Sequence, residues 1–149
     1  MKVSEAVGRL LVERGVRQVF GLIGSGNFDI TLAMVEAGAS FASSRHEGGA
    51  ITMTDAFGRA SGEVAACSVH QGPGLTNTMT GLTEAVKSHT PLLLLAAETA
   101  AGATRSNFRI DQGRWSHRSA PASPACASRR LRSTTPRLHC SGPRTSGVR

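Results

Sequence analysis

The chain repeats one local pattern three times, and this repetition limits the possible folds more than any other feature of the sequence. In each copy a short apolar run is followed by a glycine-bearing loop and then by apolar residues at helical spacing. The runs predict strands at 16–23, 40–44 and 64–69, and a fourth run predicts a strand at 91–97. Short apolar strands that alternate with helices indicate a parallel sheet covered on both faces. We therefore expect an α/β fold, a doubly wound parallel sheet with helices on both faces.

Helices are expected before the first strand and between the later ones. Ser4 and Asn27 are typical N-cap residues, and Gly15, Gly38 and Gly62 are typical of helix ends. The predicted helices cover 4–14, 27–38, 47–60 and 75–88. In a sheet of this kind ligands bind at the carboxyl ends of the strands.

Three loops follow the predicted strands and open the predicted helices, so they should gather at one end of the sheet. The loops run from Gly21 to Asn27, from Arg45 to Ala50 and from His70 to Asn77. The glycines of the first loop suggest a dinucleotide site, with Glu47 as the acid that would bind the ribose. Their order argues against it, because the loop has the pattern G-x-x-G-x-G where a dinucleotide site has G-x-G-x-x-G.

The formal net charge of +7 is concentrated at one end of the chain. Up to Gln112, nine Lys and Arg stand against ten Asp and Glu, whereas from Gly113 onward there are eight Arg and no acidic residue. We expect a domain at 1–112 and a disordered Arg/Ser/Pro-rich tail at 113–149, because the tail has too few apolar residues to offset the entropy of ordering. Its composition and its start inside a domain indicate translation from a shifted reading frame. A natural basic tail is the alternative.

The cysteines and the hydropathy pattern give limited information about the compartment. Cys67, Cys126 and Cys140 lack the close spacing of zinc ligands. Cys67 lies in an apolar run and is expected to be a small buried hydrophobe. No stretch approaches the roughly 18 apolar residues of a membrane span, and the first residues do not form a signal peptide. These features predict a cytoplasmic protein without a membrane partner.

Five strings of residues resemble a known family in their order and spacing. They are RHEGGA at 45–50, DAFGRASG at 55–62, HQGPGLTN at 70–77, TGLTEA at 80–85 and TPLLLLAAE at 90–98. Over residues 3–112 the chain resembles the N-terminal pyrimidine-binding domain of thiamine-diphosphate enzymes of the acetolactate synthase and benzaldehyde lyase-like group. The resemblance implies thiamine diphosphate as cofactor. In a complete enzyme it implies C–C bond formation or cleavage on 2-keto acids or aldehydes.

Glu47 stands at the position of the family's catalytic glutamate. That glutamate hydrogen-bonds a ring nitrogen of the cofactor's aminopyrimidine and so helps the cofactor to lose the proton of its thiazolium carbon. Taken alone, Glu47 would be interpreted as a carboxylate in a first helical turn, stabilised by the helix dipole. Its place between His46 and Gly48 in RHEGGA favours the catalytic role. The resemblance further implies that four residues of the third loop line the cofactor, Gly72, Pro73, Gly74 and Asn77, which by themselves would form a rigid turn.

Six further residues are expected to face the substrate, from the same resemblance. They are Gly24, Ser25, Gly26, His70, Gln71 and Gln112. The pair His70-Gln71 departs from the small polar residues that the family more often has, and Ile23-Gly24 stands where many relatives have Pro-Gly, which leaves the substrate class open. A histidine at a strand end can also be a hydrogen-bonded structural residue. Gln112 can likewise be an ordinary polar residue.

The family holds the diphosphate and its Mg²⁺ on a separate domain with a Gly-Asp-Gly motif, and no Gly-Asp-Gly occurs in this chain. We therefore expect a truncated product of an acetolactate synthase-like gene, inactive alone, with Mg²⁺ bound only by a missing or partner domain. One alternative is a functional subunit that needs a separate chain bearing the diphosphate- and Mg-binding domain. The expected partners are further copies in a homo-oligomer or a complementary thiamine-diphosphate-enzyme chain. Another, not favoured, is a basic protein whose tail binds nucleic acid. Pyrimidine domains bury large surfaces against partner domains, so an exposed apolar patch is also expected.

Overall fold

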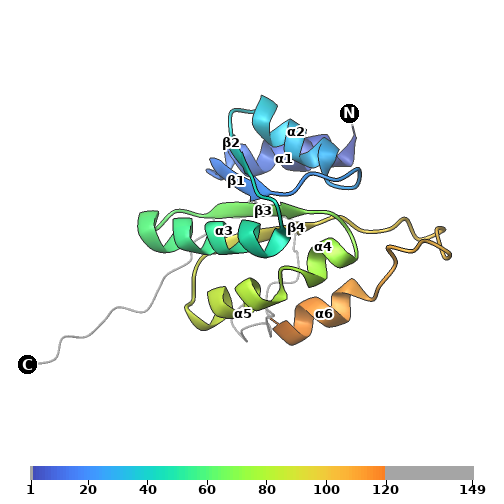
Figure 1. The fold of residues 1–149 in the computed structure, drawn as a ribbon. Coiled ribbons are helices and arrows are strands. Elements are labelled where there is room, and N and C mark those ends of the chain that lie inside the picture. The colour runs from blue at the N-terminus through green and yellow to red at the C-terminus, as the bar shows by residue number, and fades with distance from the viewer. Residues whose placement is uncertain (1, 120–149) are drawn as a thin grey trace, which may run out of the picture.

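The computed structural model describes residues 2–119, and their centre is one sheet of four parallel strands (Figure 1). The strands are β1 (Gln18–Gly21), β2 (Ser40–Ser43), β3 (Ala65–Val69) and β4 (Leu92–Ala96), in the order β2-β1-β3-β4. All three pairings are parallel, and the register places Val19 beside Ala66 and Ala66 beside Leu93. The predicted α/β fold with a parallel sheet is confirmed.

Helices cover both faces of the sheet (Figure 1). Helices α1 (Val3–Glu13) and α2 (Phe28–Glu36) pack together on one face, and α3 (Glu47–Ser61) and α5 (Met79–Lys87) on the other. The short α4 (Pro73–Thr76) precedes α5, and α6 (Gln112–Ser119) lies against α5. A doubly wound arrangement results, because the crossover through α2 and the crossover through α3 lie on opposite faces.

Two apolar cores, one on each face, hold the helices to the sheet. Val19, Met34 and Ala66 lie in the core between the sheet and the α1–α2 pair. Ile51 and Cys67 lie in the core under α3 and α5. All five residues of β3 are buried, which explains why this strand is an unbroken run of small and apolar residues.

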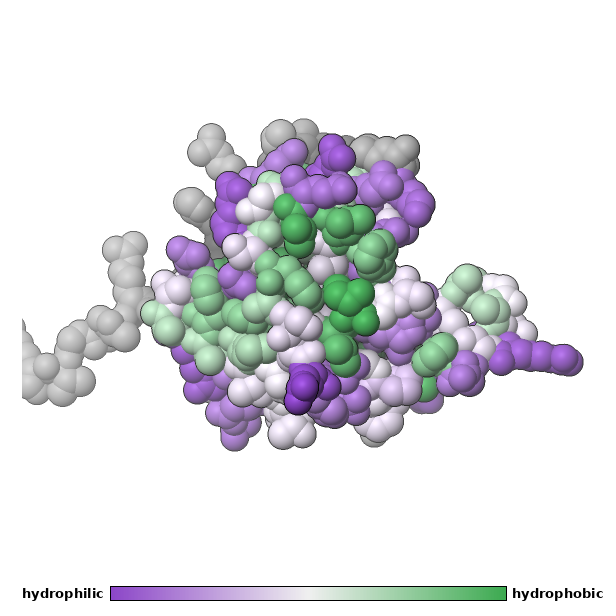
Figure 2. All heavy atoms as spheres, turned by 45° about the horizontal axis from the view of Figure 1, so that its top comes forward, coloured by the Kyte–Doolittle hydropathy of each residue, from purple (hydrophilic) through white to green (hydrophobic). Residues whose placement is uncertain are grey.

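The outer surfaces of α1 and α2 each carry a stripe of large apolar side chains spaced four and then three residues apart. Exposed apolar side chains gather on the face where these helices come forward (Figure 2). The stripes consist of Val3, Val7 and Leu10 on α1 and of Phe28, Leu32 and Val35 on α2. They form the expected exposed apolar patch, which we call the α1–α2 stripe.

The predicted helix at 75–88 is divided in the structure, and this is a correction. Helix α4 ends at Thr76 and α5 begins at Met79. The Thr78 hydroxyl donates to the Leu75 carbonyl at 2.6 Å, and the Thr78 N–H reaches the same carbonyl at 3.0 Å. At Thr78 these bonds to Leu75 take the place of the bond to residue 74 that a continuous α-helix would have.

The start of the predicted disordered tail also needs correction. Residues 113–119 belong to α6, and the Asp111 carboxylate accepts the Arg114 N–H at 3.1 Å at the start of that helix. Asp is a strong N-cap residue, so the helix has a local cause that the hydropathy pattern does not show. The rest of the predicted tail, residues 120–149, lies outside the described residues, as do Cys126 and Cys140. Within residues 2–119 no helix is long and apolar enough to span a membrane.

Candidate functional site

The three predicted loops meet at the carboxyl ends of the strands. The first loop contacts the third, because the Gly26 N–H donates to His70 Nδ1 at 3.1 Å. The second contacts the third as well, because Asn77 Nδ2 donates to Glu47 Oε2 at 2.9 Å. The convergence of the loops that the sequence predicts is therefore present, with β1 and β3 adjacent in the sheet.

Glu47 is the first residue of α3 and is buried, with 9% of its surface exposed. The N-cap residue His46 accepts the Gly48 N–H through Nδ1 at 3.0 Å, so the side chain of Glu47 is not needed for capping. Oxygen Oε2 is occupied by the Asn77 amide. Within residues 2–119, Oε1 has no hydrogen-bond partner. A buried carboxylate with one oxygen held and one available can share a proton with a ring nitrogen.

The backbone of the third loop passes directly beside this carboxylate. A Cβ built on Gly74 would lie 3.5 Å from Glu47 Oε1, so a glycine there keeps the space next to Oε1 open. A Cβ on Gly48 would lie 3.3 Å from the Asn77 carbonyl oxygen. The glycines on either side of Glu47 thus permit a close approach of two loops.

Cys67 lies on β3, in the core under α3 and α5. Burial, with a smaller contribution from the Glu47 charge, raises the pKa of Cys67 to about 12, although a hydrogen bond with Thr54 acts to lower it. The thiol is therefore neutral at physiological pH. The prediction of a small buried hydrophobe at Cys67 is confirmed.

Asn27 shapes the first loop through its side chain. Its Oδ1 accepts the Gly24 N–H at 2.8 Å, and its Nδ2 donates to the Leu22 carbonyl and to Ser68 Oγ, at 3.2 and 3.0 Å. Asn27 is the N-cap residue of α2, as predicted, but its side chain makes no capping bond. It fixes the loop to β3 instead and leaves Ser25 exposed at the tip.

His70 is packed between the first loop and a residue that the sequence analysis did not identify, Phe108. The rings of His70 and Phe108 meet edge to face, with centroids 4.9 Å apart and planes at 80°. Because Nδ1 accepts the Gly26 N–H, the ring proton of a neutral His70 is on Nε2. Gln71 lies against Gly26, and its Oε1 is buried without a hydrogen-bond partner among the described residues. Phe108 stands in a segment without periodicity, so the sequence offered no signal for it.

Gln112, which is expected to face the substrate, makes two hydrogen bonds to the backbone, and its predicted contact with substrate stays a prediction. Its Oε1 accepts the Gly72 N–H at 2.9 Å, and its Nε2 donates to the Ala97 carbonyl at 2.9 Å. The side chain thus connects the third loop to the end of β4. Pro73, at the first position of α4, is exposed, whereas Gly72 and Gly74 are buried.

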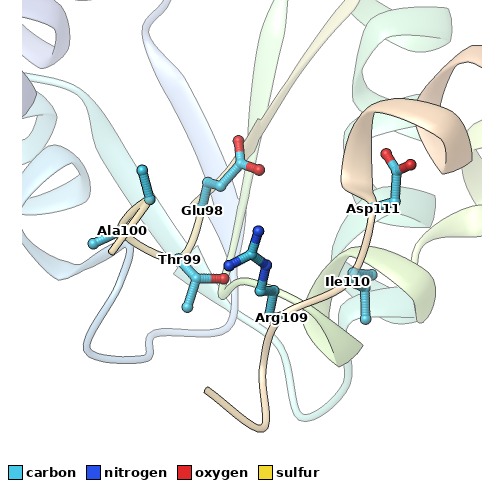
Figure 3. Close-up of a pocket in the computed structure, with 7 residues that line it drawn as sticks. Glu98, Thr99, Ala100, Arg109, Ile110 and Asp111 are labelled. Atoms are coloured by element: carbon cyan, nitrogen blue, oxygen red, sulfur yellow. The ribbon is translucent and has the colours of Figure 1, made fainter. Parts of the chain in front are cut away.

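A cleft of about 790 Å³ opens at the end of β4, and the sequence analysis did not find it. One wall is the segment from Glu98 to Ala101 and the other is Arg109 to Asp111. Figure 3 shows the Arg109 guanidinium between these walls, near Glu98 and Thr99. Among the residues that line this cleft, Asp111 is the one with a local sequence signal, because Asp is a favoured N-cap residue and it directly precedes α6.

The residues fit one half of thiamine diphosphate. Glu47 with its available oxygen, and the glycine backbone at Gly72 and Gly74, suit a flat heteroaromatic ring that must lie close to the main chain. Among the described residues no cluster of three or more His, Cys, Asp or Glu side chains could hold a metal ion.

Several known proteins and one family resemble this chain. A family model described as the N-terminal TPP binding domain of thiamine pyrophosphate enzymes matches residues 1–117, which extends into α6. The sulfoacetaldehyde acetyltransferase of Rhodobacter capsulatus is 37% identical over 113 residues, covering 76% of this chain and 18% of that protein. The large subunit of acetolactate synthase isozyme 3 of Escherichia coli is 40% identical over 98 residues, covering 65% of this chain and 17% of that protein.

A solved structure shares the fold. The thiamine diphosphate-dependent 4-hydroxybenzoylformate decarboxylase of Rhodococcus jostii superposes with a TM-score of 0.69 at 29% identity, covering 77% of this chain and 22% of that one. The chain spans less than a fifth of the length of the two curated relatives.

Proposed function

Because the chain belongs to the thiamine pyrophosphate enzymes and carries their N-terminal TPP-binding domain, we propose that Glu47 is the residue that binds the aminopyrimidine ring of the cofactor. One observation carries this proposal. Glu47 is buried, its Oε2 is held by Asn77, and its Oε1 is available next to the backbone of Gly74.

Each part of this arrangement has a physical role. The Asn77 amide fixes the rotamer of the carboxyl group, so that Oε1 has a defined position before any ligand arrives. Burial in an apolar site removes competing water and strengthens a hydrogen bond between Oε1 and a ring nitrogen. When bound, thiamine diphosphate would supply a thiazolium carbon acid that becomes a nucleophile toward carbonyl carbons once its proton is removed. Glu47 holds or gives up the proton at the pyrimidine end.

We place Gly72, Pro73 and Gly74 along the face of the pyrimidine, where two of the three are buried. The first loop and His70 would form the substrate side. In this position Ser25 and Gly26 would form the exposed rim beside the half-buried Gly24, and His70 would present Nε2–H as a donor. Gln71 would lie beside His70, with its Oε1 as an acceptor. A carbonyl or carboxylate oxygen is the group that a neutral imidazole N–H would bind.

The substrates would be 2-keto acids or aldehydes, and the reaction would form or break a C–C bond. The names of two similar proteins support this. One names an aldehyde, sulfoacetaldehyde, and the other names a keto acid, 4-hydroxybenzoylformate. The diphosphate end and Mg²⁺ would be held by a complementary chain that carries the diphosphate-binding domain, because the described residues contain no metal-binding cluster.

The proposal is tested first by titrating the ¹⁵N-labelled full chain with thiamine diphosphate. We expect amide shifts at Glu47, Gly74 and Asn77, and we expect Glu47→Gln to reduce them. A second test fuses residues 1–112 to the remaining domains of an acetolactate synthase and follows exchange of the thiazolium proton. Glu47→Gln should abolish that exchange while the cofactor remains bound. Exchange at the unchanged rate would remove Glu47 from this role.

A further inference from the structure

Gln112 connects two parts of the chain that are distant in sequence. It is 40 residues from Gly72 and 15 from Ala97, and its carboxamide bonds to the backbone of both. Only 8% of its surface is exposed. A buried side chain that accepts from one loop and donates to another needs both an acceptor and a donor, and the carboxamide of Gln112 supplies the two from one planar group.

The Gly72 N–H needs this partner. Gly72 has φ 66° and ψ −114°, and a Cβ there would collide with the Phe108 carbonyl oxygen, so the backbone conformation is open to glycine alone. The Gly72 carbonyl accepts the N–H groups of Leu75 and Thr76, at 3.0 and 3.2 Å, and so begins α4. The N–H points the other way, toward Gln112, and would be an unsatisfied buried donor without it.

The position of Gly72 is transmitted to Glu47 by two short paths. Gly74, two residues on, lies beside Glu47 Oε1. One turn of helix later, Asn77 donates to Glu47 Oε2. A shift of the peptide at Gly72 would therefore move both contacts of the carboxylate.

We propose that Gln112 is a positioning residue for the pyrimidine site, which holds Gly72 to Asn77 in the place where Gly74 and Asn77 contact Glu47. This inference rests on the proposed function of Glu47 and deepens it. Gln112 acts through the backbone of the third loop. Phe108 assists from the same segment, by its ring against His70 and its carbonyl against Gly72.

The test compares Gln112→Met with Gln112→Glu in the full chain. Methionine removes both hydrogen bonds at similar volume, whereas glutamate keeps an acceptor for Gly72 and loses the donor to Ala97. Gln18→Met is the matched control, because Gln18 lies at the start of β1 and, among residues 2–119, its side chain donates only to the carbonyl of its neighbour Val19. Far-UV circular dichroism shows whether each variant is folded.

The readouts are amide hydrogen exchange at Gly72 and the side-chain NH₂ resonances of Asn77. In Gln112→Met we expect exchange at Gly72 to accelerate roughly tenfold, the size of one lost hydrogen bond, together with a shift of the Asn77 side-chain resonances. Gln112→Glu should keep exchange at Gly72 slow, because it keeps the acceptor for the Gly72 N–H. If Gln112→Met does not fold, fast exchange at Gly72 in Gln112→Glu would contradict the inference. Gln18→Met should change neither readout.

Two results would overturn the inference. One is exchange at Gly72 that stays at the native rate in Gln112→Met. The other is fast exchange at Gly72 with unchanged Asn77 resonances. In that case Gln112 would stabilise the backbone at Gly72 without positioning Asn77 at Glu47. Failure of the proposed function would have a different result. The amide resonances of the native chain would not shift with thiamine diphosphate, while exchange at Gly72 and the Asn77 side-chain resonances would still change in Gln112→Met.

Discussion

The Asn77 amide donates to the Glu47 carboxylate across 2.9 Å, although the two residues are 30 positions apart and lie in different loops. Asn77 lies between α4, which ends at Thr76, and α5, which begins at Met79. The hydrogen bond turns a first-turn carboxylate of α3 into a group with one oxygen fixed and one available.

This pair predicts the behaviour of two variants at Asn77. In Asn77→Ala the carboxylate loses its donor, and we expect a loss of about 1 kcal/mol in the free energy of unfolding and weaker binding of thiamine diphosphate. Asn77→Asp should be worse, since it places a second carboxylate against Glu47. Urea unfolding and NMR titration measure the two effects. Equal stability and equal cofactor binding of the two variants would show that a second carboxylate at position 77 does not repel Glu47.

Gly72 and Gly102 form a matched pair for the same substitution. Gly72→Ala must adopt a positive φ and collides with the Phe108 carbonyl, so we expect a loss of about 1–3 kcal/mol in stability. A Cβ on Gly102 meets nothing within 4 Å, and Gly102→Ala should be close to neutral. Thermal unfolding of both variants tests this, and similar midpoints would contradict the strained conformation at Gly72.

Asp55 should make stability depend on acid pH. Burial acts to raise the pKa of its carboxyl, but the Arg59 guanidinium, 2.7 Å from Asp55 Oδ2, outweighs burial and keeps that pKa below its ordinary value of 3.8. A lowered pKa stabilises the fold above pH 3.8 and the stabilisation is lost as pH falls through the folded value.

We therefore expect the urea midpoint of the native chain to fall more steeply than that of Asp55→Asn as the pH drops from about 5 to about 3. Asp29→Asn on α2 controls for the loss of one negative charge. Parallel curves for the native chain and Asp55→Asn would show that Asp55 does not contribute.

Cys67 should resist alkylation in the folded chain. With its pKa raised to about 12, the thiol has almost no thiolate at neutral pH, and it is buried. Iodoacetamide at about pH 8 should leave Cys67 unmodified in native buffer and modify it in urea, as peptide mass spectrometry would show. Rapid modification without denaturant would mean that β3 opens readily.

The α1–α2 stripe should promote self-association, because contiguous exposed apolar side chains are removed from water on contact. The double substitution Leu10→Lys and Leu32→Lys should lower the mass measured by light scattering at high protein concentration. Val64→Lys, at an exposed apolar residue outside the stripe, is the control. A native chain that stays monomeric throughout would contradict this expectation.

Much of the fold follows from local patterns. The apolar runs and helix-ending glycines predict the four strands and most helix bounds, and Gly15, Gly38 and Gly62 have the positive φ that a helix-ending glycine favours. The break at residues 77–78 was missed because Thr side chains that bond to the backbone are common within helices too. Helix α6 was missed because its residues are polar and its cap is a single Asp.

The sequence by itself determined the alternation of strands and helices, the glycine loops and the place of Glu47 at a helix start, because each depends on spacing and capping within a few residues. The tertiary structure decided what those loops contact. The order β2-β1-β3-β4 places β3 between β1 and β4, so the loop after β3 lies within reach of Gly26 on one side and Ala97 on the other. The partners of Glu47, His70 and Gln112 depend on that order, and no local pattern encodes it.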